Sequence, residues 1–204
     1  MRITKTFSQL KYNRRAVFWI LAIDLALAIS STVVDWPWLI RVPRHLVFFA
    51  PICSLYPWLL VIWFTIWHFK KRVPAWFSNF LFIGLFSYGW MAWLYYPLIM
   101  TWNGFSWHDV GAILWVTAYG IQCLIIASEV KKIPWWQFLP VAGYFFFKDI
   151  SDRFFGTFLD VMLDSYPENF KIIFFAGILA LHAIAIAIVL RLQKINRPNQ
   201  HSTH

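Results

Sequence analysis

Six long apolar runs, separated by short polar loops, constrain this 204-residue chain more than any other feature. A helix needs about 20 mostly apolar residues to cross the hydrocarbon core of a bilayer, and each run comes near that length. The runs therefore predict an all-α, polytopic integral membrane bundle of about six transmembrane helices that forms one domain over residues 1–204. The expected spans are residues 16–34, 46–69, 76–98, 110–130, 134–155 and 172–190.

The composition supports this reading, because 60% of the residues are apolar and only 13% are charged. Soluble domains carry about 25% charged residues. The loops between the runs are too short for a soluble catalytic domain, so any chemistry must take place within the bilayer or at its edge. Known signatures of hydrolases, zinc proteases and P-loop ATPases are missing from the sequence. We therefore predict no catalytic residues and lean against an enzyme.

The net charge of +9 comes from basic residues beside the apolar runs, not from a clustered basic patch. This distribution does not predict nucleic-acid binding. Placing both termini in the cytoplasm puts most of the 18 Lys and Arg residues on that side, with Glu129 beside Lys131 and Lys132 as a solvated pair. We expect a multi-pass protein of the cell membrane with a polar cytoplasmic tail at residues 196–204.

Metal and haem sites are not predicted, and no cofactor is assigned. Cys53 and Cys123 lie in apolar runs without metal-ligand spacing, so both should be buried free thiols. His182 lies near the middle of the last span, where it could be a ligand, a proton relay or a hydrogen-bonded core residue, and the last reading is favoured. Haem is disfavoured because the other histidines near the spans lie at membrane edges.

Ionisable residues inside a span are costly, and they usually face the bundle interior with a partner. In the fifth run, the spacing predicts two i,i+4 ion pairs, Lys148 with Asp152 and Asp149 with Arg153. These pairs could simply fix the packing of this helix against its neighbours. Alternatively, Asp149 and Asp152 could bind a cation, a proton or a polar headgroup. Asp24 in the first run also needs a partner, and its depth along the helix predicts a contact with Lys148.

An aromatic segment in the third run contains Tyr88, Gly89 and Trp90. Gly89 should let a neighbouring helix approach closely, while the rings seek polar partners. Packing is the default reading. The alternative is a pocket near Tyr88, Trp90 and His182 for a flat or isoprenoid lipid such as a quinone.

Two segments resemble the YpjA-like family of bacterial and archaeal membrane proteins, a family of unknown function. The first is Phe86-Ser87-Tyr88-Gly89-Trp90-Met91-Ala92, and the second is Asp149-Ile150-Ser151-Asp152-Arg153-Phe154-Phe155-Gly156. The family pattern has His and Asn before the first Asp, where this chain has Phe147 and Lys148, and an aromatic residue where this chain has Arg153. The resemblance implies a polytopic fold and a respiratory context.

Three functions remain open on the sequence. The favoured one is a non-catalytic subunit, assembly helper or lipid- or quinone-binding partner of a membrane complex, which contacts the bilayer and other membrane subunits. The first alternative is a small ion-coupled transporter that uses the intramembrane charges. The second is an intramembrane lipid-modifying enzyme. It ranks last because a lysine and an arginine already neutralise the carboxylates that would hold a metal.

Overall fold

In this computed structural model, the structure describes residues 13–42, 44, 54–69, 72–154 and 166–196, with the side chains of Trp38 and Asp152 left out. Six α-helices and one 3-10 helix make up the regular structure of these residues, which contain no strand. The elements are α2 (Arg14–Leu39), α3 (Leu55–His68), α4 (Ala75–Asn103), α5 (Trp107–Ile126), η2 (Ala127–Glu129), α6 (Trp135–Phe154) and α8 (Glu168–Ile195).

Each helix lies in one of the six apolar runs, so the all-helical prediction is confirmed for the described residues. Proline directly precedes α4, α6 and α8, where its fixed φ suits the start of a helix. Four helices are long and apolar enough to cross a membrane: residues 14–37, 75–103, 107–129 and 168–195. The apolar helix α3 is shorter, with 14 residues, and α6 carries four charged residues near its end.

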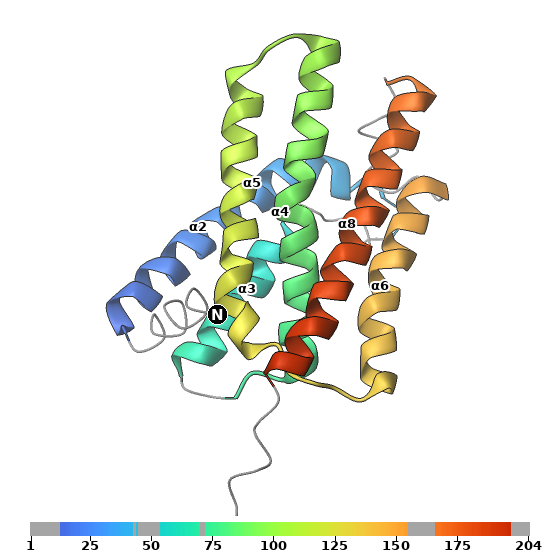
Figure 1. Cartoon of the computed structure of the whole chain (residues 1–204). Helices are drawn as coiled ribbons and strands as arrows, with labels where there is room; N and C mark the ends of the chain where they lie inside the picture. Colours follow the sequence, from blue (N-terminus) through green and yellow to red (C-terminus); the bar gives the residue numbers. More distant parts are fainter. Residues whose placement is uncertain (1–12, 43, 45–53, 70–71, 155–165, 197–204) are drawn as a thin grey trace, which may run out of the picture.

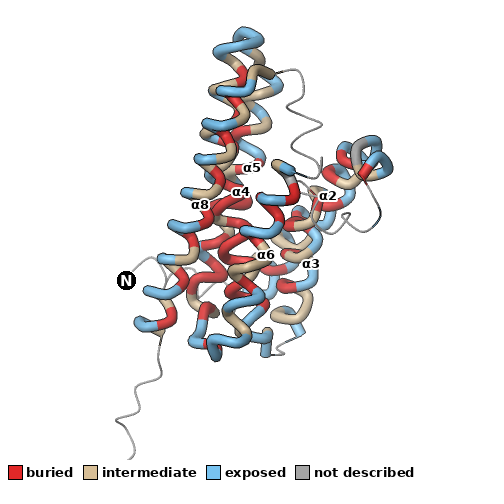
Figure 2. Tube along the Cα trace, turned by 90° about the vertical axis from the view of Figure 1, so that its right-hand side faces the viewer, coloured by how far each residue is buried: buried red, intermediate tan, exposed pale blue. Residues whose placement is uncertain are grey.

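The helices α4, α5, α6 and α8 lie side by side with alternating directions, while α2 starts beside α5 and passes behind α5 and α4 at a steep tilt (Figure 1). The central helix is α4, which packs against α3, α5, α6 and α8, whereas α2 packs mainly on α3. Buried residues gather along α4 and the faces turned toward it (Figure 2). The interior of the bundle is therefore built around the third apolar run.

The tightest helix contact joins α4 to α5 through two glycines. A Cβ atom placed on Gly89 would lie 2.2 Å from the Cα atom of Gly120, so no side chain fits there without separating the helices. Small residues let helix backbones approach in this way. The predicted close contact at Gly89 is confirmed.

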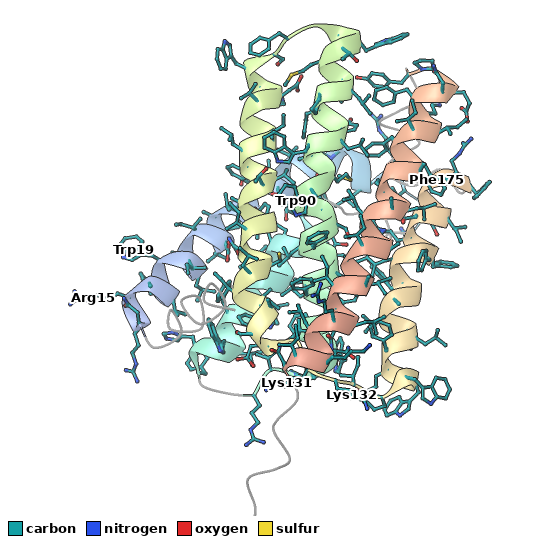
Figure 3. The ribbon with its side chains drawn as sticks, in the orientation of Figure 1. Arg15, Trp19, Trp90, Lys131, Lys132 and Phe175 are labelled. Atoms are coloured by element: carbon teal, nitrogen blue, oxygen red, sulfur yellow. The ribbon has the colours of Figure 1, made fainter. Side chains whose placement is uncertain are left out.

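Several basic side chains lie at one end of the bundle. The helices α2, α4 and α6 begin at this end and α3, α5 and α8 finish there, and Figure 3 shows Arg15, Lys131 and Lys132 near it. Lys131 Nζ lies 3.6 Å from Glu129 Oε2, as predicted for a solvated pair. Two amides tie the helix ends together, because Asn79 donates to the Lys131 carbonyl at 3.0 Å and Asn196 to the Val130 carbonyl at 2.8 Å.

Candidate functional site: two buried aspartates and a groove

A buried Asp–His pair joins α6 to α8. His182 Nδ1 and Asp149 Oδ2 are 2.7 Å apart, and both side chains are almost completely buried. The prediction that His182 is a hydrogen-bonded core residue is therefore confirmed. The hydrogen bond between Asp149 Oδ2 and Nδ1 also fixes the orientation of the imidazole ring.

The predicted ion pair between Asp149 and Arg153 is wrong. Asp149 turns toward His182, and the Arg153 guanidinium contacts the Glu168 carboxylate at the start of α8. Asp149 and Arg153 each pair with a side chain of α8, which packs beside α6, and not with each other one turn apart on α6. The predicted pair of Lys148 with Asp152, and a cation site formed with Asp152, lie outside the described side chains.

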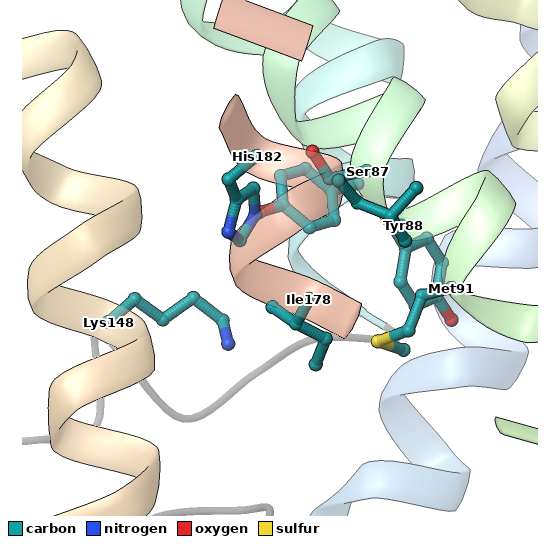
Figure 4. A pocket seen from close by; sticks show the side chains of 8 residues that line it. Ser87, Tyr88, Met91, Lys148, Ile178 and His182 are labelled. Carbon is teal, nitrogen blue, oxygen red and sulfur yellow. The ribbon is translucent and has the colours of Figure 1, made fainter. Parts of the chain in front are cut away.

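A small cavity adjoins the Asp–His pair (Figure 4). It offers about 20 Å³ to the centre of a water molecule, which is room for about one water. Lys148 reaches it from α6, and its amine is buried with the rest of the side chain. The lining residues are Tyr56, Ser87, Tyr88, Met91, Lys148, Ile178, Leu181 and His182.

The sequence placed Tyr88, Trp90 and His182 in one pocket, and the structure brings only two of them together. Tyr88 and His182 line the small cavity, whereas Trp90 is 47% exposed and does not line it. Two buried hydroxyls have no hydrogen-bond partner among the described residues: that of Ser87 on the cavity wall and that of Ser151 on α6. The cavity is lined mainly by apolar surface, with Ser87, Lys148 and His182 as groups that can hydrogen-bond a very small ligand such as water.

The second buried aspartate, Asp24, pairs with an amide instead of a cation. Gln122 Nε2 of α5 donates to Asp24 Oδ1 at 2.8 Å, and Asp24 is fully buried. The predicted contact with Lys148 is wrong, because α2 and α6 lie on opposite sides of the bundle (Figure 1). Depth along a helix axis carries no information about which helix lies alongside.

The sequence reading missed Gln122, although a signal was available. Gln122 is a strongly polar side chain in the middle of an otherwise apolar run, and a polar group in such a place needs a partner on another helix. Its amide offers both a donor and an acceptor, which makes it a natural partner for a carboxyl group.

A larger groove lies between α2, α4 and α5. Its volume is about 530 Å³, within the range of small-molecule sites. Val34 and Trp115 on its rim are 68% and 42% exposed, so the groove opens to the outer surface of the helices. The lining is mainly apolar and aromatic: Ser30, Ser31, Val34, Tyr88, Tyr96, His108, Gly111, Ala112, Trp115 and Val116.

Among the described residues, no group of three or more His, Cys, Asp and Glu side chains could hold a metal ion. Cys123 is buried and free, as predicted, and Cys53 lies outside the described residues. Comparisons with protein-family models, curated proteins and solved structures found no match to this chain.

Proposed function

We propose that this chain is a multi-pass protein of the cell membrane that binds a quinone-like isoprenoid lipid in the groove between α2, α4 and α5. Its role is non-catalytic, as a subunit, assembly helper or partner of a larger membrane complex. The observation that carries the proposal is the groove itself: about 530 Å³, lined by aromatic and apolar side chains and open to the outer surface of the helices.

The lining fits a ligand with a flat polar head and an apolar tail. Tyr88, Tyr96 and Trp115 supply aromatic faces and edges against which a ring can pack. Ser30, Ser31 and His108 supply hydrogen-bonding groups at separate points of an otherwise apolar wall. Ser30 Oγ already donates to the Ala26 and Leu27 carbonyls of α2, so towards a ligand its oxygen acts as an acceptor.

Six spans with both termini in the cytoplasm account best for α3 and α6. The charged part of α6 meets partners on α8, through Asp149–His182 and Arg153–Glu168, so its charges need not face lipid. The 14 residues of α3 reach only about 21 Å, shorter than a bilayer core of about 30 Å. Residues 46–53 of the expected span lie outside the described residues.

Cysteine labelling tests the orientation. Ser106→Cys in the loop between α4 and α5 should react with a membrane-impermeant maleimide in intact cells. Lys132→Cys between η2 and α6 should react only after the cells are permeabilised. Both native cysteines, Cys53 and Cys123, are replaced by Ala in this background. Equal labelling of both positions from outside would contradict the proposed topology.

The groove is tested by native purification followed by mass spectrometry of bound lipids. Gly111 lines the groove, and a Cβ placed on it meets nothing within 4 Å, so Gly111→Leu adds an apolar side chain at the groove wall from an open position. Gly143 of α6 is equally open and lies away from the groove, so Gly143→Leu is the matched control. We expect isoprenoid lipid in the wild type and in Gly143→Leu, and its loss in Gly111→Leu.

A second candidate function, ion-coupled transport, draws support from the buried Asp149–His182 pair beside a cavity that Lys148 lines. Intramembrane ionisable groups are common in proton and ion pathways. Flux in proteoliposomes that survives Asp149→Asn together with Asp152→Asn would remove this centre from a transport mechanism.

A further inference from the structure

In the Asp24–Gln122 pair, one oxygen of the carboxyl group and the oxygen of the amide have no hydrogen-bond partner within the described part of the chain. The bond from Gln122 Nε2 to Asp24 Oδ1 uses one oxygen of the carboxyl group. Asp24 Oδ2 and Gln122 Oε1 are both buried and have no hydrogen-bond partner among the described residues. Buried polar atoms without a partner are rare and need an explanation.

A single proton resolves both unsatisfied atoms. An ionised carboxylate can only accept hydrogen bonds, and so can an amide oxygen, which means the two leftover atoms cannot satisfy each other as they stand. A protonated carboxyl group has an O–H that donates to the amide oxygen. A planar carboxylic acid and a planar carboxamide then share two parallel hydrogen bonds, N–H to O and O–H to O.

We infer that Asp24 is a proton-binding site: its carboxyl group holds a proton and forms a two-bond acid–amide pair with Gln122, which joins α2 to α5. The surroundings favour the neutral form, because a carboxylate buried without a cation is costly. Asp24 is fully buried, and its hydrogen-bond partner is an uncharged amide.

Charged groups lie far along every helix that packs around this pair. On α2, Arg15 and Asp35 are more than two turns away from Asp24. On α5, Asp109 and His108 lie in the first turn, and Glu129 of η2 follows Gln122 by about two turns. The nearest titratable neighbours of Gln122 in sequence are Tyr119 and Cys123, whose side chains are ordinarily uncharged at neutral pH.

The other two helices contribute no charge at this level. The described length of α4 contains no Asp, Glu, Lys, Arg or His, and in α3 the one ionisable group besides tyrosine is His68, its last residue. No described cation is therefore placed to compensate an ionised Asp24, whereas Asp149 faces His182.

Infrared spectroscopy tests the proton directly. The wild-type protein in lipid nanodiscs should show the carbonyl stretch of a protonated carboxyl group. This absorption should disappear in Asp24→Asn and persist in Asp149→Asn, which is the matched control. An unchanged protonated-carboxyl band in Asp24→Asn, or loss of a carboxylate band in its place, would overturn the inference.

Thermal unfolding supplies an independent readout. Asn has the shape of a protonated Asp and can keep both hydrogen bonds with Gln122, so Asp24→Asn should unfold at the wild-type temperature. Asp24→Ala and Gln122→Ala each leave a buried group unpaired and should lower Tm by about 2–4 °C. An Asp24→Asn variant that is as unstable as Asp24→Ala, or that does not fold, would show that the carboxylate is required and would overturn the proposal.

The proton site also has a consequence for the groove, and this part rests on the proposed function. Ser30 and Ser31 on the groove wall follow Asp24 by about two turns on α2, and Val116 precedes Gln122 by about two turns on α5. The pair therefore holds together the same two helices that form the groove walls. Asp24→Ala should reduce bound isoprenoid lipid at least twofold and Asp24→Asn should leave it unchanged.

The two proposals fail separately. If Gly111→Leu leaves the bound lipid unchanged, the groove proposal is rejected. The infrared measurement still tests the proton on Asp24 independently. If Gly111→Leu removes the lipid and Asp24→Ala does not, only the link between the proton site and the groove is rejected.

Discussion

A buried aspartate lies on each side of the α4–α5 hairpin, and the two aspartates have hydrogen-bond partners of different chemistry. On the α6–α8 side, Asp149 meets His182 at 2.7 Å beside a cavity that holds about one water. On the α2 side, Asp24 meets the neutral amide of Gln122 at 2.8 Å, close to a groove of about 530 Å³. The contrast teaches that the partner's chemistry, not burial alone, decides what a buried carboxyl group does. The ionisable His182 favours a structural pair with Asp149, whereas the neutral amide of Gln122 favours the protonated form of Asp24 that we infer.

The largest effect should come from breaking the α6–α8 pair. Asp149→Ala leaves His182 buried without its partner, and leaving a buried hydrogen-bonding group unpaired costs about 1–3 kcal/mol. The free energy of unfolding, measured by denaturant titration in detergent, should fall by that amount. The double variant Asp149→Leu with His182→Leu should recover most of the loss, because no polar group is then left unpaired. A double variant no more stable than Asp149→Ala would contradict a purely structural role.

The α4–α5 contact comes next. Gly89→Ala places a Cβ 2.2 Å from Gly120 Cα, and overpacking of this kind costs about 1–3 kcal/mol. The matched control is Gly111→Ala on α5, where the added Cβ meets nothing within 4 Å. We expect the unfolding temperature to fall for Gly89→Ala and to stay level or rise for the control. Equal stability of the two variants would show that the helices separate freely at this point.

A smaller effect is expected on the α2 side. Asp24→Ala removes hydrogen bonds between neutral groups, which in membrane proteins average about 0.6 kcal/mol. Its unfolding free energy should therefore fall less than that of Asp149→Ala. If the two alanine variants lose equal stability, the distinction between a proton-bearing and a histidine-paired aspartate is lost.

The sequence was enough to place the six helices, but not to choose their neighbours. Run length and proline positions locate α4, α6 and α8 because these properties depend on one segment at a time. The pairs Asp149–His182, Arg153–Glu168 and Asp24–Gln122 depend on which faces meet across helices. Helical spacing gives the depth of each residue and its neighbours on one helix, which is why the predicted pairs of Asp149 with Arg153 and Asp24 with Lys148 failed.

The groove illustrates the same limit. Tyr88 stood out in the sequence, but the helices that form the opposite walls, α2 and α5, come from separate runs with no common motif. Trp90 lies two residues from Tyr88 and faces outward at 47% exposure. A cavity between helices depends on tilt and packing, and α2 crosses the bundle steeply (Figure 1).

Photocrosslinking tests the central claim, lipid binding in the groove, most directly. The protein in nanodiscs is irradiated with a photoreactive isoprenoid quinone, and the adducts are mapped by tandem mass spectrometry. We predict adducts on the groove residues Ala112, Trp115 and Val34, competed away by unlabelled quinone and lost in Gly111→Leu. Adducts spread evenly over lipid-facing positions such as Phe146 of α6 and Ile184 of α8, without competition, would contradict the proposed function.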